Sequence, residues 1–200
     1  MIKSYIVGIW IVLIAGAALS VVYELTASTT QAPVQAVDGE QPQAARQVCF
    51  TLNPGNNCEA MIVRIINAAA HRIHVQAYLF TDEDIARALE GASRRSLEVI
   101  VLLDKRERTE RRSVAPELVE AGVKVLLDDH PAIAHNKTII IDPDSSNPVV
   151  ETGSLNFTYS AERRNAENVL IVRNDHRLVA AYERNFQNRL AASEPWDQGE

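Results

Sequence analysis

From residue 59 onward, the chain alternates between two patterns of apolar and polar positions. In the first, apolar residues recur at helical spacing, which predicts amphipathic helices over residues 59–70, 81–95, 114–121 and 176–192. In the second, short runs are apolar throughout, which predicts buried strands over residues 73–80, 97–103, 123–127, 137–141, from 149 onward, and 168–172. Thr81 and Asp84 have the spacing of a capping box for the second helix. The alternation predicts an α/β fold, a layered α/β/α sandwich with a central mixed, largely parallel sheet.

The N-terminal residues follow neither pattern. Lys3 precedes an uncharged, mostly apolar run at residues 4–23, which is at the lower limit of length for crossing a bilayer. Ala18 and Ser20 are the small residues that a signal peptidase needs. Residues 1–25 are therefore predicted to be either a signal peptide or a membrane anchor, with residues 4–23 attaching the protein to the membrane in the second case.

The next segment, residues 26–47, is rich in Thr, Ala, Gln and Pro, the composition of a flexible linker. This division leaves a globular domain at residues 48–192 and a tail at residues 193–200. Both interpretations of the N-terminus carry the domain out of the cytoplasm. We therefore expect an exported protein, periplasmic or extracellular, or one anchored to the inner membrane.

Export changes the expectation for the two cysteines of the chain, Cys49 and Cys58. They stand on either side of a turn at Pro54 and Gly55, at the edge of the globular domain. An even number of cysteines in an exported protein predicts one disulfide, which here would close a small loop. The alternative is a pair of unlinked small hydrophobic residues.

Charge is informative locally rather than overall. The chain has 20 basic and 26 acidic residues, and the net charge of −6 gives no support for a nucleic-acid partner. Residues 105–112, however, hold five basic and two acidic side chains just after a predicted strand, where open α/β sheets bind ligands. One interpretation is a basic wall for a polyanion, with Arg108, Arg111 and Arg112 as candidates for a substrate groove. The other is a solvated, salt-bridged helix face.

Side chains suited to catalysis gather between residues 135 and 167. His135 and Lys137 stand two residues apart where a strand is predicted to begin, so they should point to the same face. Asp142 has the opposite parity and stands at the far end of that strand, so we assign it a structural role.

The next predicted strand leads to a Gly-Ser-x-Asn sequence. Gly153 permits close approach of another backbone segment. The Ser154 hydroxyl and the Asn156 amide can donate hydrogen bonds to phosphoryl oxygens. Glu167 follows near the start of the last predicted strand.

Taken together, this set resembles the signature of the phospholipase D superfamily. The chain is similar to the small bacterial endonucleases of that superfamily that carry a single copy of the motif, and the similarity extends over nearly all of residues 47–190. The matching segments are VQAYLFT from residue 75, AIAHNK from residue 132, TGSLNFT from residue 152 and NAENVL from residue 165.

The resemblance implies a phospholipase D/nuclease-like fold and a reaction that uses no metal and no other cofactor. It implies that His135 attacks phosphorus and forms a covalent phosphohistidine. Lys137 and Asn156 would bind the phosphoryl oxygens, with support from Ser154. Glu167 would hydrogen-bond a catalytic imidazole.

The chemistry of phosphodiester cleavage requires a second catalytic group. The leaving oxygen needs an acid, and a protonated imidazole can serve. Because the chain has one His-x-Lys sequence, two copies of His135 related by a two-fold axis would supply both nucleophile and acid. We therefore expect an obligate homodimer with one shared active site.

Metal-dependent hydrolysis is the competing mechanism. Residues 128–130, Asp-Asp-His, are the only cluster that resembles a set of metal ligands. Adjacent residues at the end of a strand point apart, so we interpret this cluster as a loop. His71 and His74 have no evident ligand partners.

Three functions are compatible with these residues. The first is a non-specific exported endonuclease acting on DNA or RNA, and the second is a phospholipase D that hydrolyses phospholipids such as phosphatidylcholine. Both would use the same site. The third, an inactive membrane-tethered module that binds nucleic acid, is disfavoured by the complete set of catalytic residues.

Overall fold

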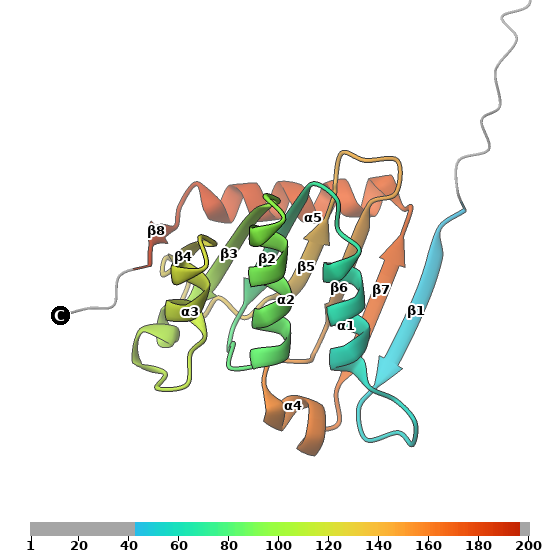
Figure 1. Ribbon diagram of the computed structural model, residues 1–200, viewed down its shortest axis with the longest axis horizontal. Coiled ribbons are helices and arrows are strands. Elements are labelled where there is room, and N and C mark those ends of the chain that lie inside the picture. The colour runs from blue at the N-terminus through green and yellow to red at the C-terminus, as the bar shows by residue number, and fades with distance from the viewer. Residues whose placement is uncertain (1–42, 197–200) are drawn as a thin grey trace, which may run out of the picture. The chain divides into compact units, whose positions relative to one another are not determined.

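An eight-stranded sheet forms the centre of the domain in the computed structural model, which describes residues 43–196 (Figure 1). Its strands are β1 (Ala45–Phe50), β2 (Arg72–Ala77), β3 (Glu98–Asp104), β4 (Lys124–Asp128), β5 (Lys137–Ile141), β6 (Val149–Gly153), β7 (Asn168–Arg173) and β8 (Glu194–Pro195). Across the sheet they follow the order β1-β7-β6-β5-β2-β3-β4-β8. Strands β5, β6 and β7, which carry most of the candidate site, are therefore direct neighbours.

The sheet is mixed, as predicted, but the prediction that it is largely parallel is wrong. Strand β3 is parallel to both β2 and β4. All other neighbouring pairs are antiparallel. The reason is visible in the connection between β5 and β6, residues 142–148, because so short a link can join antiparallel strands only.

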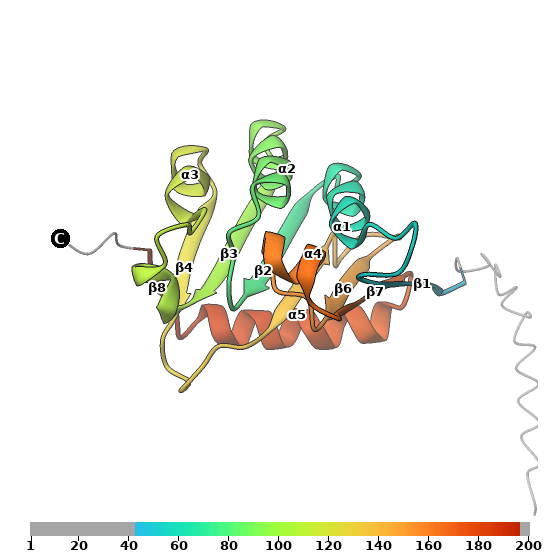
Figure 2. The ribbon, with the colours of Figure 1, turned by 90° about the horizontal axis from the view of Figure 1, so that it is seen from below.

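The helices cover both faces of the sheet. They are α1 (Cys58–Asn67), α2 (Glu83–Arg94), α3 (Ala115–Glu120), α4 (Tyr159–Arg164) and α5 (His176–Leu190), with a short 3-10 helix, η1 (Lys105–Thr109), after β3. Figure 2 shows α1, α2 and α3 on one face and α5 alone on the other. This arrangement confirms the layered α/β/α architecture.

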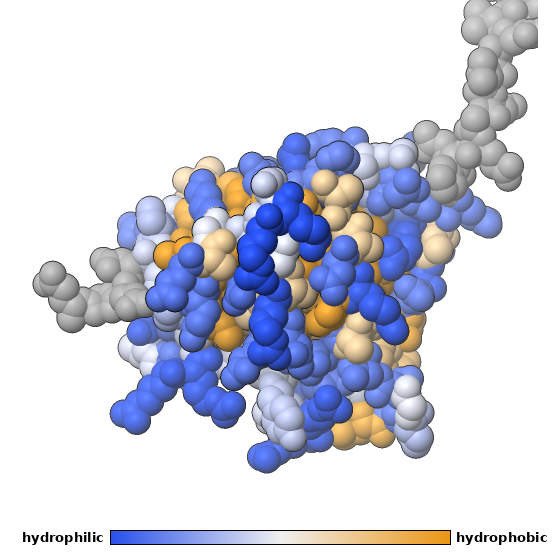
Figure 3. Space-filling view, viewed as in Figure 1, coloured by the Kyte–Doolittle hydropathy of each residue, from blue (hydrophilic) through white to orange (hydrophobic). Residues whose placement is uncertain are grey.

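The strands alternate their side chains between two hydrophobic cores. On β5, Ile139 and Ile141 belong to the larger core beneath α1, α2 and α3, while Ile140 belongs to the smaller core beneath α5. Val179 and Phe186 of α5 complete the smaller core. Hydrophilic residues cover most of the outer face formed by α1, α2 and α3, with smaller hydrophobic areas between them (Figure 3). The sheet is therefore buried on both faces, as its apolar strands predicted.

The predicted disulfide is confirmed. Cys49 on β1 and Cys58 at the start of α1 are joined, with an S–S distance of 2.00 Å. The bond holds the edge strand β1 to the first helix. Strand β1 begins at Ala45, inside the segment predicted as linker, and β8 lies inside the predicted tail. Both strands pair with the sheet, so the ordered domain extends past residues 48 and 192.

Helix α2 starts differently from the prediction. The Asp82 carboxylate, not Thr81, caps it, since Asp82 Oδ1 accepts hydrogen bonds from the backbone N–H groups of Asp84 and Ile85, each at 3.0 Å. The predicted capping box at Thr81 and Asp84 is therefore wrong. Helix α4 and η1 were not predicted because both are short and lack apolar residues at helical spacing.

The predicted signal peptide or membrane anchor, residues 1–25, lies outside the described residues. Between residues 43 and 196, no helix combines the length and the apolar character needed to cross a membrane.

Candidate active site

The candidate site lies at one end of four neighbouring strands, where β2 and β6 finish and β5 and β7 begin. In the register of the sheet, Ala77 at the end of β2 pairs with Lys137 at the start of β5. Thr138 of β5 pairs with Thr152 of β6, and Gly153 at the end of β6 pairs with Val169 near the start of β7. These pairs bring residues around 78, 135, 154 and 167 to the same end of the strands.

His135 and Lys137 are in direct contact, as their spacing predicted. Lys137 Nζ lies 3.1 Å from His135 Nδ1 and donates a hydrogen bond to the His135 carbonyl oxygen at 2.8 Å. The His135 side chain is exposed, whereas Lys137 is buried. The site therefore presents an imidazole to solvent with an ammonium group directly behind it.

Tyr78, which follows β2, supports this pair and was not predicted as a site residue. Its ring centroid is 4.5 Å from that of His135, and its ring centre is 5.0 Å from Lys137 Nζ. The aromatic ring thus limits the orientations of the imidazole and interacts favourably with the lysine cation. An aromatic residue near the end of the strand predicted over residues 73–80 is the only signal in the sequence, and it equally suits a core residue.

Ser154 and Glu167 form the second half of the site. Ser154 Oγ donates a hydrogen bond to Glu167 Oε2 at 2.5 Å and accepts one from the Asn168 backbone N–H at 3.1 Å. Asn165 Nδ2 donates to the other carboxylate oxygen of Glu167 at 3.1 Å. Within the described part of the chain, the Glu167 carboxylate bonds to these groups and not to His135.

The charges of the two halves interact. Burial lowers the pKa of Lys137, and the negative charge of Glu167 opposes that lowering. Glu167 therefore helps to keep Lys137 in its cationic form, which a phosphate-binding group requires.

Gly153 is required by close contact with β7. A side-chain Cβ at this position would lie 2.1 Å from the Asn168 carbonyl oxygen, which no rotamer change can relieve because both groups belong to the backbone. That same carbonyl accepts a hydrogen bond from the Ser154 N–H at 3.1 Å. The absence of a side chain thus lets β6 place Ser154 next to Glu167.

Asn156 is held near the site by its neighbour Phe157. The Phe157 carbonyl oxygen accepts hydrogen bonds from Thr81 N–H at 2.9 Å and Asp82 N–H at 3.0 Å, and its ring contacts Phe80 edge-on at 5.5 Å. Asn156 Oδ1 is buried and has no hydrogen-bond partner among residues 43–196. Oδ1 can only accept a hydrogen bond, so contact with a phosphoryl oxygen would have to come from the amide N–H groups.

Asp142 lies at the opposite end of β5 from His135. Its carboxylate accepts hydrogen bonds at 2.8 Å from the backbone N–H groups of Ala70, His71 and Arg72. These bonds tie the end of β5 to the connection between α1 and β2. Asp142 thus belongs to the scaffold, the role that strand parity indicated.

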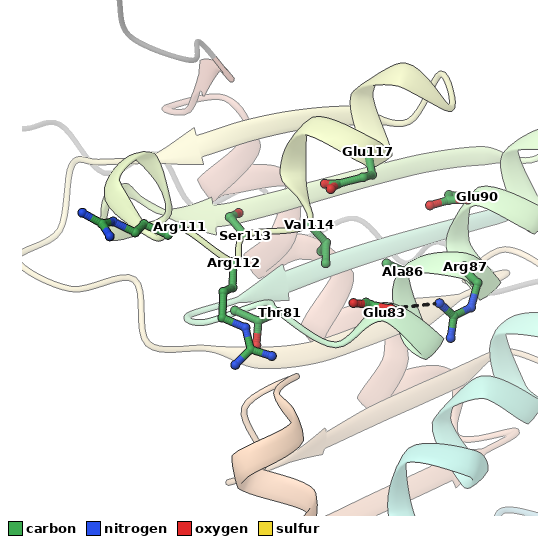
Figure 4. Close-up of a pocket in the computed structure, with 10 residues that line it drawn as sticks. All are labelled: Thr81, Glu83, Ala86, Arg87, Glu90, Arg111, Arg112, Ser113, Val114 and Glu117. Carbon is green, nitrogen blue, oxygen red and sulfur yellow. Dashed lines mark hydrogen bonds and ion pairs between the residues drawn. The ribbon is translucent and has the colours of Figure 1, made fainter.

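The arginine candidates lie beyond the site on the side of α2 and α3. Arg111 and Arg112 line a cavity of about 400 Å³ together with three carboxylates, those of Glu83, Glu90 and Glu117 (Figure 4). His135 and Lys137 do not line it. Arg108 is exposed on η1. Within residues 43–196 none of these three arginines forms an ion pair, so the salt-bridged interpretation is wrong for them.

The residues considered as metal ligands have other partners. Asp128 Oδ2 accepts a hydrogen bond from Arg189 Nε at 2.7 Å. His74, for which no partner was expected, is buried and lies 2.9 Å from Glu183 Oε2. Among residues 43–196, no three His, Cys, Asp or Glu side chains are grouped so as to hold a metal ion.

An imidazole and a lysine at the ends of the strands of an α/β sheet, near hydroxyl and amide groups, are suited to phosphoryl transfer. The family model described as "Cardiolipin synthase, PLD-like domain" matches residues 62–190. The chain therefore belongs to the phospholipase D superfamily and is a phosphodiesterase hydrolase of that superfamily.

Individual relatives agree with this assignment. "Phospholipase D" of Rickettsia prowazekii is 41% identical over 145 residues, which cover 72% of this chain and 67% of the relative. "Mitochondrial cardiolipin hydrolase" of Xenopus laevis is 31% identical over 135 residues, 68% of this chain and 61% of the relative. Among solved structures, Nuc from Salmonella typhimurium, a phospholipase D family member, superimposes with a TM-score of 0.70 at 31% identity. The match covers 76% of this chain and 98% of that one.

Proposed function

We propose that the protein is an exported, non-specific endonuclease that hydrolyses phosphodiester bonds of DNA and RNA without a metal ion. The supporting observation is the exposed position of His135, 3.1 Å from Lys137 Nζ, on the same sheet edge as an arginine-rich segment free of ion pairs among the described residues. A long polymer can reach such an exposed site from the side, and the arginines would attract its phosphates. The resemblance to the single-motif endonucleases points the same way.

The reaction would proceed in two displacements. His135 attacks phosphorus, the bond from phosphorus to the leaving oxygen breaks, and a second imidazole protonates that oxygen. Water then attacks the phosphohistidine, the same second imidazole takes its proton, and His135 is released. Lys137 and Asn156 would bind the phosphoryl oxygens in both steps, and Ser154 would hold Glu167 in place.

The second imidazole would come from a second copy of the chain. His135 is exposed, so a two-fold related His135 can face it across one phosphate. Among the described residues of its own chain, the Glu167 carboxylate bonds to Ser154 and Asn165 and not to His135. The imidazole that Glu167 would orient is therefore that of the partner subunit. We therefore propose an obligate homodimer with one shared active site.

Mixing subunits tests the shared site. When wild-type chains are exchanged with an equal amount of the His135→Asn variant, about one quarter of the dimers should be wholly wild-type. At the same total protein concentration, activity should therefore fall to about one quarter of that of the wild type alone. Activity that falls in proportion to the wild-type fraction, to about one half, would show that each subunit works alone. Full activity of a dilute monomer, measured by sedimentation at the assay concentration, would equally contradict the dimer.

A paired substrate assay tests the proposed activity. The soluble domain is incubated in EDTA with plasmid DNA, with RNA and, separately, with phosphatidylcholine vesicles. We expect both nucleic acids to be cut at many positions and the lipid to remain intact. Loss of nucleic-acid cleavage in EDTA, with recovery on addition of a divalent cation, would contradict the metal-independent mechanism.

Hydrolysis of phospholipids is the second candidate. Two observations favour it. Relatives carry the names "Phospholipase D" and "Mitochondrial cardiolipin hydrolase". In addition, β1 and the loop after it expose large apolar side chains. Val48, Phe50 and Leu52 have exposed fractions of 56%, 50% and 58%. Such side chains can enter a lipid surface. Release of the head group in the assay above, without nucleic-acid cleavage, would select this function.

Export is supported by the disulfide. A bond between Cys49 and Cys58 persists in oxidising compartments and is rare in a cytosolic protein. We therefore place the domain in the periplasm or outside the cell. Whether residues 4–23 attach it to the inner membrane can be tested by fractionating cells and sequencing the N-terminus of the mature protein.

A further inference from the structure

Arg106, on the 3-10 helix after β3, reaches the active site through Tyr78. Its Nη1 group donates a hydrogen bond to Tyr78 Oη at 2.6 Å. The Tyr78 ring in turn contacts the His135 imidazole, with 4.5 Å between ring centroids. An exposed arginine from the basic segment is thus connected to the candidate nucleophile by one intervening side chain.

A second connection, independent of Tyr78, joins the backbones of the two segments. Asp104 is buried, and its Oδ1 accepts a hydrogen bond from Arg106 N–H at 2.9 Å. Its Oδ2 accepts one from the N–H of Ala134, the residue before His135, at 2.6 Å. One carboxylate therefore holds the start of η1 and the segment that carries His135 at a defined separation.

The distance between the Arg106 guanidinium and the His135 imidazole suits two phosphates of one nucleic-acid strand. The Arg106 guanidinium carbon lies 5.7 Å from the Tyr78 ring centroid, so it is at most about 10 Å from the imidazole, the sum of the two separations. Phosphates of one strand advance by roughly 3.4 Å along the axis of a duplex and lie farther apart than this in space, because the strand also winds around the axis; a phosphate one position from the scissile one falls in this range. A diester with a single phosphate has no second phosphate for Arg106 to bind.

The donors of Arg106 are also suited to this contact. A guanidinium has five N–H groups in a planar fork, and the hydrogen bond to Tyr78 uses one of them. Arg106 forms no ion pair with any of residues 43–196, and its side chain is exposed. Tyr78 therefore fixes one edge of the guanidinium and leaves the other for a ligand oxygen.

We propose that Arg106, held by Tyr78 and Asp104, binds a phosphate of the nucleic-acid strand next to the one attacked by His135. It thereby selects polynucleotides over diesters with a single phosphate. This inference rests on the proposed endonuclease function. The proposal gives Arg106 a different role from Arg111 and Arg112, which line the cavity that also contains three carboxylates.

The test compares two substrates for each variant: a single-stranded oligonucleotide and bis(p-nitrophenyl) phosphate, which has one phosphate. For Arg106→Ala, the ratio of kcat/KM on the oligonucleotide to that on the small diester should fall roughly 10- to 100-fold, the range of one hydrogen bond to a charged group. The slope of log(kcat/KM) against log[salt] should become shallower by about 0.7 on the oligonucleotide. For Arg106→Lys, which keeps the positive charge but not the planar guanidinium, the ratio should lie between that of the wild type and that of Arg106→Ala.

Two further variants separate binding from positioning. Tyr78→Phe keeps the ring beside His135 but removes the hydroxyl, so it should lower the same ratio, and the double variant Tyr78→Phe/Arg106→Ala should lose no more than Arg106→Ala alone. Arg177→Ala removes an equally exposed charge on α5 and should leave the ratio as in the wild type. Thermal melting of each variant confirms that it is folded.

The outcomes are distinct. Equal losses on both substrates in Arg106→Ala, or no loss on either, would overturn the inference while wild-type cleavage of the oligonucleotide leaves the proposed function standing. If the wild type hydrolyses the small diester but no oligonucleotide, the endonuclease function is wrong, and this inference is wrong with it.

Discussion

Replacing His135 with asparagine should lower phosphodiester hydrolysis by at least about a thousandfold on every substrate that the wild type cleaves. Asparagine is similar in size and can still accept a hydrogen bond from Lys137, but its amide cannot attack phosphorus or carry the phosphoryl group. In a shared site the substitution also removes the general acid, because the nucleophile and the acid are the His135 side chains of the two subunits. Single-turnover kinetics on DNA and on bis(p-nitrophenyl) phosphate measure the loss.

His71→Asn is the matched control for this substitution. His71 is exposed near the far end of β5, where its backbone N–H bonds to Asp142, so exchanging its side chain should leave activity as in the wild type. Wild-type protein quenched in alkali during turnover should carry phosphorus on the peptide that contains His135, detectable by mass spectrometry. Substantial turnover by His135→Asn, or phosphorus on another residue, would contradict the mechanism.

Much of the fold follows from local pattern, but the direction of the strands does not. Apolar runs locate the central strands because those strands are buried on both faces, where most positions are apolar. The prediction of a largely parallel sheet is wrong, and the connection of seven residues, 142–148, is by itself too short for a parallel crossover between β5 and β6. Helix α4 is short and polar, so periodicity could not reveal it.

Some features of the candidate site depend on residues that are close together in the chain, and others depend on residues that are far apart in it. The two-residue period of a strand was enough to place His135 beside Lys137, and a glycine before Ser154 was enough to indicate close approach. The contribution of Tyr78 depends on pairing between β2 and β5, strands about 60 residues apart in the chain, and no local pattern records that pairing. The connection through Asp104 is equally long-range.

Glu151 shows most clearly what the sequence could not reveal. It lies in the middle of β6, where it pairs with Ile139 and Ile171 of the larger core. Its side chain is fully buried, and neither carboxyl oxygen has a hydrogen-bond partner among residues 43–196. Burial raises the pKa of Glu151 well above its ordinary value and so favours the neutral form of the group. Read along the chain, Glu151 was simply a polar residue between two valines and the Gly-Ser-x-Asn sequence.

Replacing Glu151 with methionine, which has a similar shape, should stabilise the domain, and the gain should grow with pH. At acidic pH, where the carboxyl is neutral in both the folded and the unfolded state, we expect a gain of about 1–3 kcal/mol in the free energy of unfolding, the cost of burying a polar group without partners. Above the ordinary pKa, the unfolded chain releases the proton while the folded domain keeps it. Wild-type stability therefore falls by about 1.4 kcal/mol for each pH unit until the pH reaches the raised pKa of Glu151, and the variant lacks this loss.

Urea unfolding of both proteins between about pH 4 and pH 8 measures the effect, and the difference between them isolates Glu151 from other carboxyls whose pKa values are raised, such as Glu59 and Glu107. Glu120→Met, at an exposed position on α3, is the control and should change neither the stability nor its dependence on pH. A destabilised Glu151→Met, or a difference that does not vary with pH, would mean that Glu151 is ionised and paired in the folded protein. A carboxylate paired inside β6, the strand that leads to Ser154, would then have to be considered part of the active site.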